Sequence, residues 1–291
     1  MTSSYPEMDG GRLQVIENIR SAVERGDSFA KVELGDPKIT EDDIRRVIYP
    51  FDNLRKKPIN KIKAYIARKI AERETKKINI NTDIIGLENA LGISGGAIIT
   101  CNHFNIVDNT IPRILAQKCG RGAKFDILIQ ENNVFMDGFF GFLMKNCNTL
   151  PISSSVQYSL KNLRPALETL LSRGDFVLIY PEQEMWFNYK KPRTLREGAY
   201  HFAFDMGVPI IPCFVEMREI DGFDAQGFRN IKHILHVMPP IYPDKQLIAR
   251  EGRAKMREID TAYKKECYER VYGIKLDPEF IPERDIAGYH K

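Results

Sequence analysis

The stretch Ala97-Ile98-Ile99-Thr100-Cys101-Asn102-His103-Phe104-Asn105-Ile106-Val107-Asp108 is the part of the chain from which the fold can be worked out. Its first residues form a short apolar, β-branched run, which predicts a buried strand over residues 97–101. Apolar residues then recur at helical spacing at positions 111, 114 and 115, so we expect a helix to begin near Asp108. His103 and Asp108 therefore lie in the turn between a strand and a helix, where the carboxylate can meet the imidazole.

A His–Asp pair in such a turn is suited to general-base catalysis. A neutral imidazole can take a proton from a hydroxyl group, and the carboxylate fixes the tautomer and stabilises the imidazolium that forms. The alternative is that His103 fills a turn and that Asp108 is an ordinary residue at the start of a helix.

Further blocks of the sequence accompany this pair. Together with Asn102-His103-x4-Asp108 they resemble the glycerolipid acyltransferases, which acylate glycerol 3-phosphate or lysophosphatidic acid, and they stand in the family's order over about residues 95–216. Tyr180-Pro181-Glu182 is similar to the opening of the family's Phe-Pro-Glu-Gly-Thr-Arg motif. The other two blocks are Leu195-Arg196-Glu197-Gly198-Ala199 and Val208-Pro209-Ile210-Ile211-Pro212.

The resemblance implies direct transfer of a fatty acyl group from a thioester, carried by acyl carrier protein or coenzyme A, to a hydroxyl, or an amine, of a lipid acceptor. His103 would be the base and Asp108 would orient it. Asn102 and Glu182 would help to bind substrate, with Glu182 on the acceptor's hydroxyl groups. Backbone N–H groups at the start of the helix after His103 would stabilise the oxyanion. The resemblance implies no metal and no cofactor besides the thioester cosubstrate.

The chain departs from the family pattern where the family places arginines that bind phosphate. Gln183-Glu184-Met185 replaces Gly-Thr-Arg, and no basic residue lies near residues 152–155, where the family's other arginine would fall. Four nearby basic residues are possible substitutes: Lys190, Lys191, Arg193 and Arg196. Otherwise Gln183, Glu184 and Trp186 suit an acceptor that offers hydroxyls, an amine or a sugar face.

Composition limits the cellular setting. The 291 residues are 43% hydrophobic and carry a net charge of +4, and no apolar run approaches the roughly 18 residues of a membrane-spanning helix. The N-terminus has no signal-peptide pattern, and five cysteines without a Cys-x-x-Cys pair fit a reducing compartment. We expect a cytoplasmic protein that is peripheral on the inner face of the membrane.

The N-terminal region, residues 1–80, predicts helices near 13–26, 42–51 and 59–76 after a disordered start at residues 1–10. Ten basic residues against two acidic ones lie between residues 55 and 77. A basic amphipathic helix of this kind can lie on an anionic membrane. The alternative is that Ile62, Tyr65, Ile66 and Ile70 pack on the main domain. No motif indicates nucleic-acid binding.

Residues 81–291 predict an α/β acyltransferase domain with a C-terminal helix. Alternating strands and helices favour a mostly parallel sheet covered by helices, and His103 and Glu182 each follow the carboxyl end of a strand, so they could share one site. Strands are expected at 97–101, 125–130, 149–152, 176–180, 210–216 and 234–238. Helices are expected at 110–119, 158–173, 195–206 and 245–272, before an irregular tail.

Some features allow two interpretations. The Phe- and Met-rich residues 135–144 could line an acyl-chain tunnel or pack in the core. The Gly-x-Ser-x-Gly pattern at residues 92–96 precedes a strand, so we interpret it as a turn and not as a hydrolase elbow. His233 and His236 are expected to be structural. The whole chain could also be a non-catalytic member that binds lipid or a partner, or a hydrolase of acyl thioesters.

Overall fold

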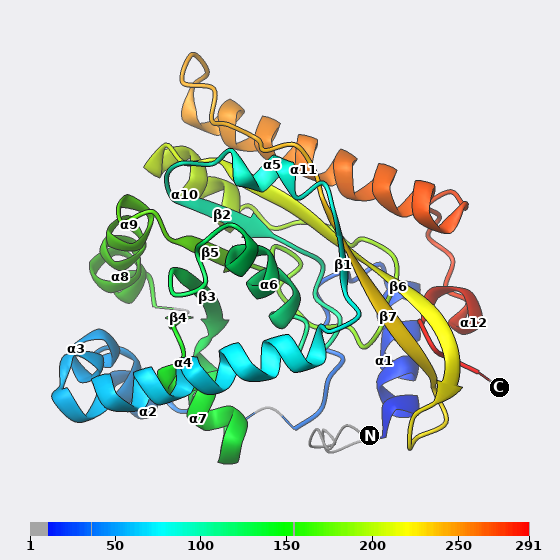
Figure 1. Cartoon of the computed structure of the whole chain (residues 1–291), viewed down its shortest axis with the longest axis horizontal. Coiled ribbons are helices and arrows are strands. Elements are labelled where there is room, and N and C mark those ends of the chain that lie inside the picture. Colours follow the sequence, from blue (N-terminus) through cyan, green and yellow to red (C-terminus); the bar gives the residue numbers. More distant parts are fainter. Residues whose placement is uncertain (1–10, 36, 154, 291) are drawn as a thin grey trace.

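The computed structural model describes residues 11–35, 37–153 and 155–290. In this part of the chain seven strands form a sheet in the order β1-β7-β6-β2-β5-β3-β4, and helices pack around it (Figure 1). The expected α/β class with a mostly parallel sheet is confirmed. The disorder that we predict for residues 1–10 lies outside the described residues.

The central strand of the sheet is β2 (Ala97–Thr100), and all four of its residues are buried. It pairs in parallel with β5 (Phe176–Ile179) on one side and with β6 (Ile210–Phe223) on the other. Beyond β5 lie β3 (Phe125–Gln130) and β4 (Thr149–Ile152), also parallel. Because these five strands point the same way, their carboxyl ends meet at one edge of the sheet, where ligands bind in such folds.

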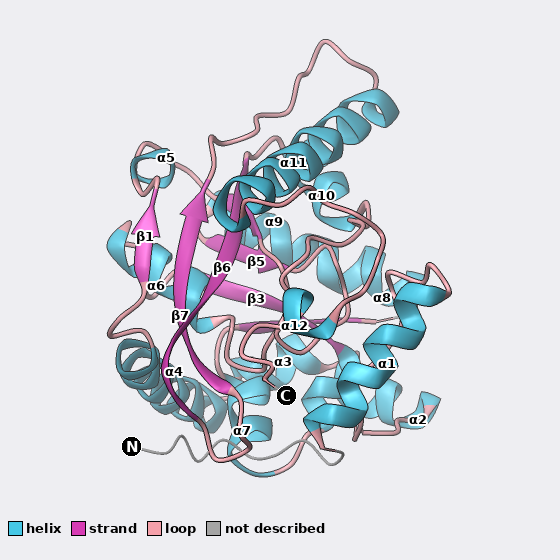
Figure 2. Cartoon of the chain, turned by 90° about the vertical axis from the view of Figure 1, so that its right-hand side faces the viewer, coloured by secondary structure: helices cyan, strands magenta, loops and turns pink. Residues whose placement is uncertain are grey.

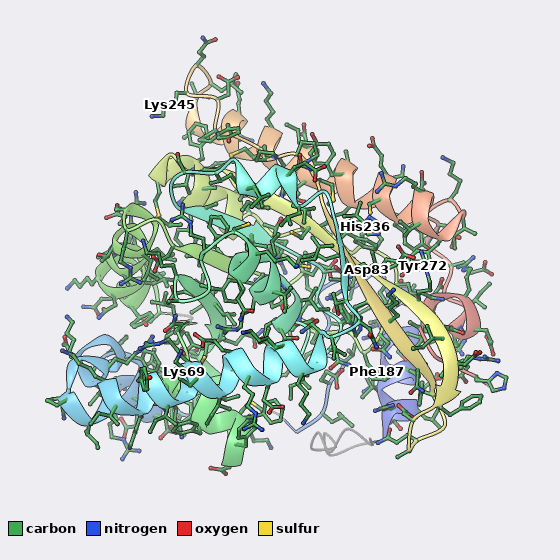
Figure 3. The ribbon with its side chains drawn as sticks, in the orientation of Figure 1. Lys69, Asp83, Phe187, His236, Lys245 and Tyr272 are labelled. Atoms are coloured by element: carbon green, nitrogen blue, oxygen red, sulfur yellow. The ribbon has the colours of Figure 1, made fainter. Side chains whose placement is uncertain are left out.

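The other edge of the sheet differs most from the prediction. β6 and β7 (Arg229–Val237) form an antiparallel hairpin that extends beyond the predicted ranges. The last six residues of β6 are exposed. Their sequence therefore has no apolar run, the pattern by which a buried strand is predicted, and the predicted strand ends too early. β1 (Asp83–Ile85) is absent from the prediction because three residues cannot show a strand period. It pairs with β7, and Asp83 (Figure 3) forms a 2.7 Å ion pair with Lys232.

Helices cover both faces of the sheet because the chain first crosses from β2 towards β4 and then crosses back from β4 towards β6. α6 (Thr110–Lys118) and α7 (Gly138–Asn146) lead from β2 to β3 and from β3 to β4. α9 (Arg164–Ser172) and α10 (Gly198–Met206) lead back from β4 to β5 and from β5 to β6. Right-handed crossovers place the two pairs on opposite faces, and Figure 2 shows α6 and α10 on opposite sides of the sheet.

Three long or composite helices complete these layers. α4 (Pro58–Ile78) packs outside α6 and α7, and α11 (Ala249–Tyr272) packs on α10 and β6. The helix predicted at 158–173 is in three parts: α8 (Val156–Tyr158), a π-helical turn (Ser159–Leu163) and α9. α10 and α11 begin three and four residues later than predicted, and a short helix, α5 (Glu88–Leu91), precedes β2.

The N-terminal region contacts two separate parts of the molecule. α2 (Glu41–Asp43), a π-helical turn (Ile44–Ile48) and α3 (Phe51–Lys56) lead into α4. α1 (Arg12–Glu24) instead packs in an apolar cluster with Trp186, Tyr189 and Ile286. Phe187 also lies beside α1 (Figure 3), where the Arg12 guanidinium stands 5.0 Å from its ring centroid. The expected irregular tail includes a short helix, α12 (Pro282–Asp285), and its residues Asp285 and Ile286 are fully buried.

The turn before β2 is confirmed as a structural feature. Residues 92–96 lie between α5 and β2, and a Cβ atom on Gly96 would stand 2.2 Å from the Leu171 carbonyl oxygen. This close approach requires glycine at position 96, so the second glycine of the Gly-x-Ser-x-Gly pattern has a structural reason.

A buried polar cluster fixes α11 to the sheet. Asp260 accepts hydrogen bonds from Thr100 Oγ1 at 2.7 Å and from the Tyr200 hydroxyl at 2.6 Å. Lys264 forms an ion pair with Asp260 and donates to Thr100 Oγ1 at 3.1 Å. A buried charge is tolerated only when it is paired and hydrogen-bonded, and this cluster satisfies both charges.

A second pair of buried carboxyl groups, Asp126 and Asp175, lies at the amino edge of the sheet, away from the carboxyl ends of the strands. Arg173 donates to both oxygens of Asp175, at 3.0 and 3.1 Å. Asp126 Oδ2 has no hydrogen-bond partner among the described residues. Burial, and next the charge of Asp175, raise the pKa of Asp126 to about 7, against the smaller opposing effects of Arg55 and Arg173.

We expect Asp126→Asn to reduce the pH dependence of stability. A carboxyl whose pKa is raised in the folded protein stabilises the fold at acid pH and loses that contribution as pH rises through about 7. From pH 5 to pH 8 this amounts to roughly 3 kcal/mol. Urea unfolding at both pH values should show a fall in the free energy of unfolding that is smaller in the variant by that amount. Equal falls in the two proteins would contradict the assignment.

Candidate active site

His103 and Asp108 meet in the turn that follows β2, as the sequence predicts. His103 Nδ1 lies 2.8 Å from Asp108 Oδ2. The same oxygen accepts hydrogen bonds from the N–H groups of Phe104, at 2.8 Å, and Asn105, at 3.1 Å. α6 begins at Thr110, so Asp108 lies in the turn and not in the first helical turn. The Phe104 and Asn105 N–H groups therefore hold Asp108 in place.

The second ring nitrogen of His103, Nε2, is the one that can accept a proton from a substrate. With Nδ1 bonded to Asp108, Nε2 is the nitrogen that can take a proton in the neutral tautomer. The His103 side chain is 22% exposed, whereas that of Asp108 is 2% exposed. The pair thus has a buried carboxylate behind a partly accessible imidazole, which is the arrangement of a general base and the group that orients it.

Tyr180, the residue directly after β5, joins this pair, and its role is not apparent from the sequence. Thr100 of β2 pairs with Ile179 of β5, so the residues that follow the two strands are neighbours. The Tyr180 ring stacks on His103 with 4.0 Å between centroids, and its hydroxyl donates to Asp108 Oδ1 at 2.5 Å. Burial, and next Asp108, raise the pKa of Tyr180 well above its ordinary value, so the hydroxyl keeps its proton. The signal in the sequence was a tyrosine at the end of a neighbouring parallel strand.

Glu182 is close to His103, as predicted, but it is buried and bonded to protein groups. Its Oε2 accepts a hydrogen bond from the His103 backbone N–H at 3.2 Å and one from Arg193 Nη2 at 3.1 Å. Its Oε1 accepts from the Arg193 backbone N–H at 3.0 Å. With 1% of the residue exposed, Glu182 holds the backbone of the site and does not face an acceptor.

Arg193 is also part of the framework of the site. Besides Glu182, it donates to the Glu184 carbonyl and, at 3.0 Å, to the Ser28 carbonyl. Its guanidinium lies 4.5 Å from the Trp186 ring centroid. Burial lowers the pKa of Arg193, and Glu182 opposes this effect. A guanidinium that is 3% exposed and used in this way is not placed to bind a phosphate.

Trp186 and Asn102 likewise serve the framework. The Trp186 indole N–H donates to the Ala30 carbonyl at 2.9 Å, and the residue is 2% exposed. Asn102 bonds to both backbone groups of Val215, accepting from N–H at 2.8 Å and donating to C=O at 3.2 Å. It thereby ties the turn after β2 to β6. These positions differ from the substrate-binding ones that we expected from the family pattern.

The remaining predicted residues, Gln183, Glu184 and Arg196, are at least partly accessible. Gln183 has φ +65°, the left-handed conformation that favours glycine. Its side chain accepts a hydrogen bond from Arg196 Nε at 3.2 Å. Glu184 accepts one from Gln130, the last residue of β3, at 2.8 Å. These groups form a polar rim on the loop that directly follows Glu182.

The other basic and histidine residues are used elsewhere. The buried Lys191 forms ion pairs with the partly exposed Asp277 at 3.1 Å and with the buried Asp285 at 3.0 Å, and burial lowers the pKa of Lys190. His236 Nε2 lies 2.8 Å from Glu216 Oε2 within the β6–β7 hairpin. Of the four basic candidates, Arg196 is the one with an exposed side chain in the described structure.

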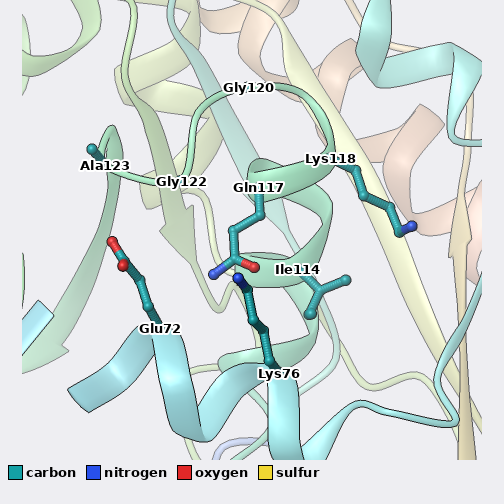
Figure 4. A pocket seen from close by; sticks show the side chains of 8 residues that line it. All are labelled: Glu72, Lys76, Ile114, Gln117, Lys118, Gly120, Gly122 and Ala123. Atoms are coloured by element: carbon teal, nitrogen blue, oxygen red, sulfur yellow. The ribbon is translucent and has the colours of Figure 1, made fainter. Parts of the chain in front are cut away.

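Two grooves lie between the N-terminal helices and the main layers. One, of about 570 Å³, separates α4 from α6, and Figure 4 shows Lys76 of α4 pointing towards Gln117 while Glu72 points towards the segment of Gly122 and Ala123. None of the predicted site residues lines it. The other, of about 400 Å³, is bounded by α3, α4 and α7. Met136 and Phe142 line this groove while Phe140 is buried, so residues 135–144 share the two interpretations given above.

Comparisons with known proteins identify the region around this site. Residues 74–216 match the model of the acyltransferase family. A comparison with curated proteins found no match. Among solved structures, the chain is similar to the 1-acyl-sn-glycerophosphate (LPA) acyltransferase PlsC from Thermotoga maritima, with 18% sequence identity and a TM-score of 0.48 over 79% of this chain and 89% of the other.

Arg193 and Arg196 offer a matched test of the framework. Arg193→Met breaks a buried ion pair and leaves Glu182 unpaired, so we expect the free energy of unfolding to fall by about 3 kcal/mol. Arg196→Met removes an exposed arginine and should change it by about 0.5 kcal/mol. Urea unfolding of both variants measures the difference. Equal stabilities would show that Arg193 does not have a structural role.

Proposed function

We propose that this chain, of which residues 74–216 match the model of the acyltransferase family, moves a fatty acyl group from acyl carrier protein or coenzyme A to a hydroxyl of a lipid acceptor, with His103 as general base. The observation that carries the proposal is the geometry of His103 and Asp108, in which one ring nitrogen is bonded to a buried carboxylate and the ring is partly accessible.

The proposed reaction is a direct transfer. His103 Nε2 takes the proton of the acceptor hydroxyl as its oxygen attacks the thioester carbonyl carbon, and Asp108 stabilises the imidazolium. The tetrahedral intermediate collapses with cleavage of the C–S bond, and the thiolate leaves as the thiol after taking the proton from His103. No enzyme nucleophile is needed, and the thioester is the only cosubstrate.

Acceptor binding is assigned to the polar rim, because the groups behind it are used by the framework. Arg196 is exposed and would supply the positive charge if the acceptor carries phosphate. Gln183 and Glu184 offer an amide and a carboxylate to hydroxyl or amine groups. Glu182, which the family pattern assigns to the acceptor, is here proposed to act on His103 through its backbone N–H.

The direct test is acyl transfer by the purified protein. It uses a labelled long-chain acyl thioester on each carrier and lipid acceptors with and without phosphate. We expect an acylated product, and we expect His103→Gln to lower the rate by at least about 100-fold because a general base contributes on that order. His201→Gln is the matched control, since this residue lies on α10 and pairs with Asp205 outside the site.

The alternatives give different results in the same assay. Acyl release to water without any acceptor would identify a thioester hydrolase. Tight lipid binding with no turnover would identify a non-catalytic member. If a phosphorylated acceptor is preferred, Arg196→Met should raise its KM and leave that of an uncharged acceptor unchanged.

We also propose that α4 places the protein on an anionic membrane surface. Ile62 and Tyr65 are each 58% exposed and Ile66 is 46% exposed, so packing on the main domain does not account for them. Exposed lysines, among them Lys61, Lys63 and Lys69, lie on the same helix. An apolar stripe with flanking lysines is typical of helices that lie in the plane of a membrane surface. None of the helices in the described residues combines the length and hydrophobicity needed to cross a bilayer.

Vesicle binding tests this surface. We expect the protein to bind vesicles that contain phosphatidylglycerol, and Ile62→Ser with Ile66→Ser to weaken binding at least about tenfold because less apolar area enters the membrane. The control variant, Tyr242→Ser with Ile248→Ser, changes two residues that are as exposed but precede α11. Equal binding by the two variants, or none by the unmodified protein, would contradict the assignment to α4.

A further inference from the structure

The contact that neither the sequence nor the proposed reaction explains is the one between Tyr180 and the His103–Asp108 pair. Tyr180 touches both members, through ring stacking at 4.0 Å and a hydroxyl bond of 2.5 Å. A phenylalanine, which begins the Phe-Pro-Glu block quoted above, would keep the stacking and lose the bond. The hydroxyl is therefore the part of Tyr180 that needs an explanation.

We propose that Tyr180 is a positioning residue that sets the basicity of His103 by sharing the charge of Asp108. The inference rests on the proposed function, because it assigns Tyr180 a role in the same general-base step. Tyr180 touches no reacting atom in this account and acts through Asp108.

The bonds of Asp108 explain how this works. Its Oδ2 faces His103 Nδ1 and two backbone N–H groups, while its Oδ1 accepts the Tyr180 hydroxyl. A hydroxyl that donates to one oxygen stabilises the carboxylate and draws negative charge away from the other oxygen. The imidazolium at His103 is then less stabilised, which favours the neutral base that the reaction needs.

The surroundings of His103 contain few other groups that could dominate its titration. Glu182 approaches through the His103 backbone N–H and is paired with Arg193. The ring of His233 of β7 packs tilted against Phe104, with 5.5 Å between ring centroids, and burial lowers the pKa of His233 to about 4, so it is uncharged at neutral pH. Asp108 and Tyr180 are thus the polar groups that contact the imidazole directly.

The variant Tyr180→Phe removes the hydroxyl group that donates to Asp108 and keeps the ring. By NMR of histidine-labelled protein, with the His103 signal assigned from its absence in His103→Gln, we expect the titration midpoint of His103 to rise by about half a unit to one unit. The acid limb of the rate–pH profile should move by the same amount. Transfer should then fall by up to about tenfold on the acid side and by less than twofold at pH 8.5, with the acceptor KM unchanged.

Tyr200→Phe is the matched control. It removes a hydroxyl that donates to another buried carboxylate, Asp260, at 2.6 Å, in the cluster beneath α11. Both variants should lose similar stability, but only Tyr180→Phe should move the His103 midpoint and the acid limb.

The outcomes separate this inference from the proposed function. If the active protein keeps its midpoint and acid limb in Tyr180→Phe, or if they move downward, Tyr180 is not a positioning residue. If unmodified protein transfers no acyl group to any acceptor, the proposed function fails and Tyr180 has no general-base step to support. A midpoint that rises in Tyr180→Phe alone, in a protein whose transfer requires His103, supports both.

Discussion

The register of β2 between β5 and β6 is the constraint on which the site depends. Since Thr100 pairs with both Ile179 and Pro212, the segments that follow β2 and β5 leave the sheet side by side. His103 then meets Tyr180, and Asn102 reaches the backbone of Val215 in β6. A shift of one residue in β2 would turn its side chains to the opposite faces of the sheet and separate these partners. The buried cluster around Asp260, which includes Thr100, holds β2 against α11.

Two buried ion pairs hold the loop that follows β5. The Glu182–Arg193 ion pair joins the His103 backbone to the loop after β5 and, through the Ser28 carbonyl, to the segment that follows α1. Lys191 with Asp285 joins the same loop to the C-terminal segment. Segments from both ends of the described chain, outside the region that matches the family model, thus hold the loop that carries Glu182. Buried ion pairs contribute little net stability, but they are costly to break, so they favour one arrangement of this loop.

The same framework accounts for the pattern of charge near the site. Arg193 and Lys191, which lie close to Glu182 in the sequence, form ion pairs with the buried carboxylates of Glu182 and Asp285, whereas Arg196 is exposed beside Gln183. Basic residues on α4 face solvent together with isoleucines. Near the site, Arg196 therefore offers accessible positive charge, whereas the buried charges of Arg193 and Lys191 hold the loop after β5.

The sequence by itself determined the α/β class, the positions of most strands and the meeting of His103 with Asp108. These depend on local patterns, because apolar runs mark buried strands and five residues suffice to close a turn. It did not determine β1 or the exposed end of β6, which have no apolar pattern, nor the roles of Tyr180, Glu182 and Arg193. Only the tertiary structure decided these, because hydrogen bonding across strands and the burial of a charge depend on segments as distant as Ser28 and Asp285. A motif in the sequence names which residue types are present, whereas packing decides which of them face solvent.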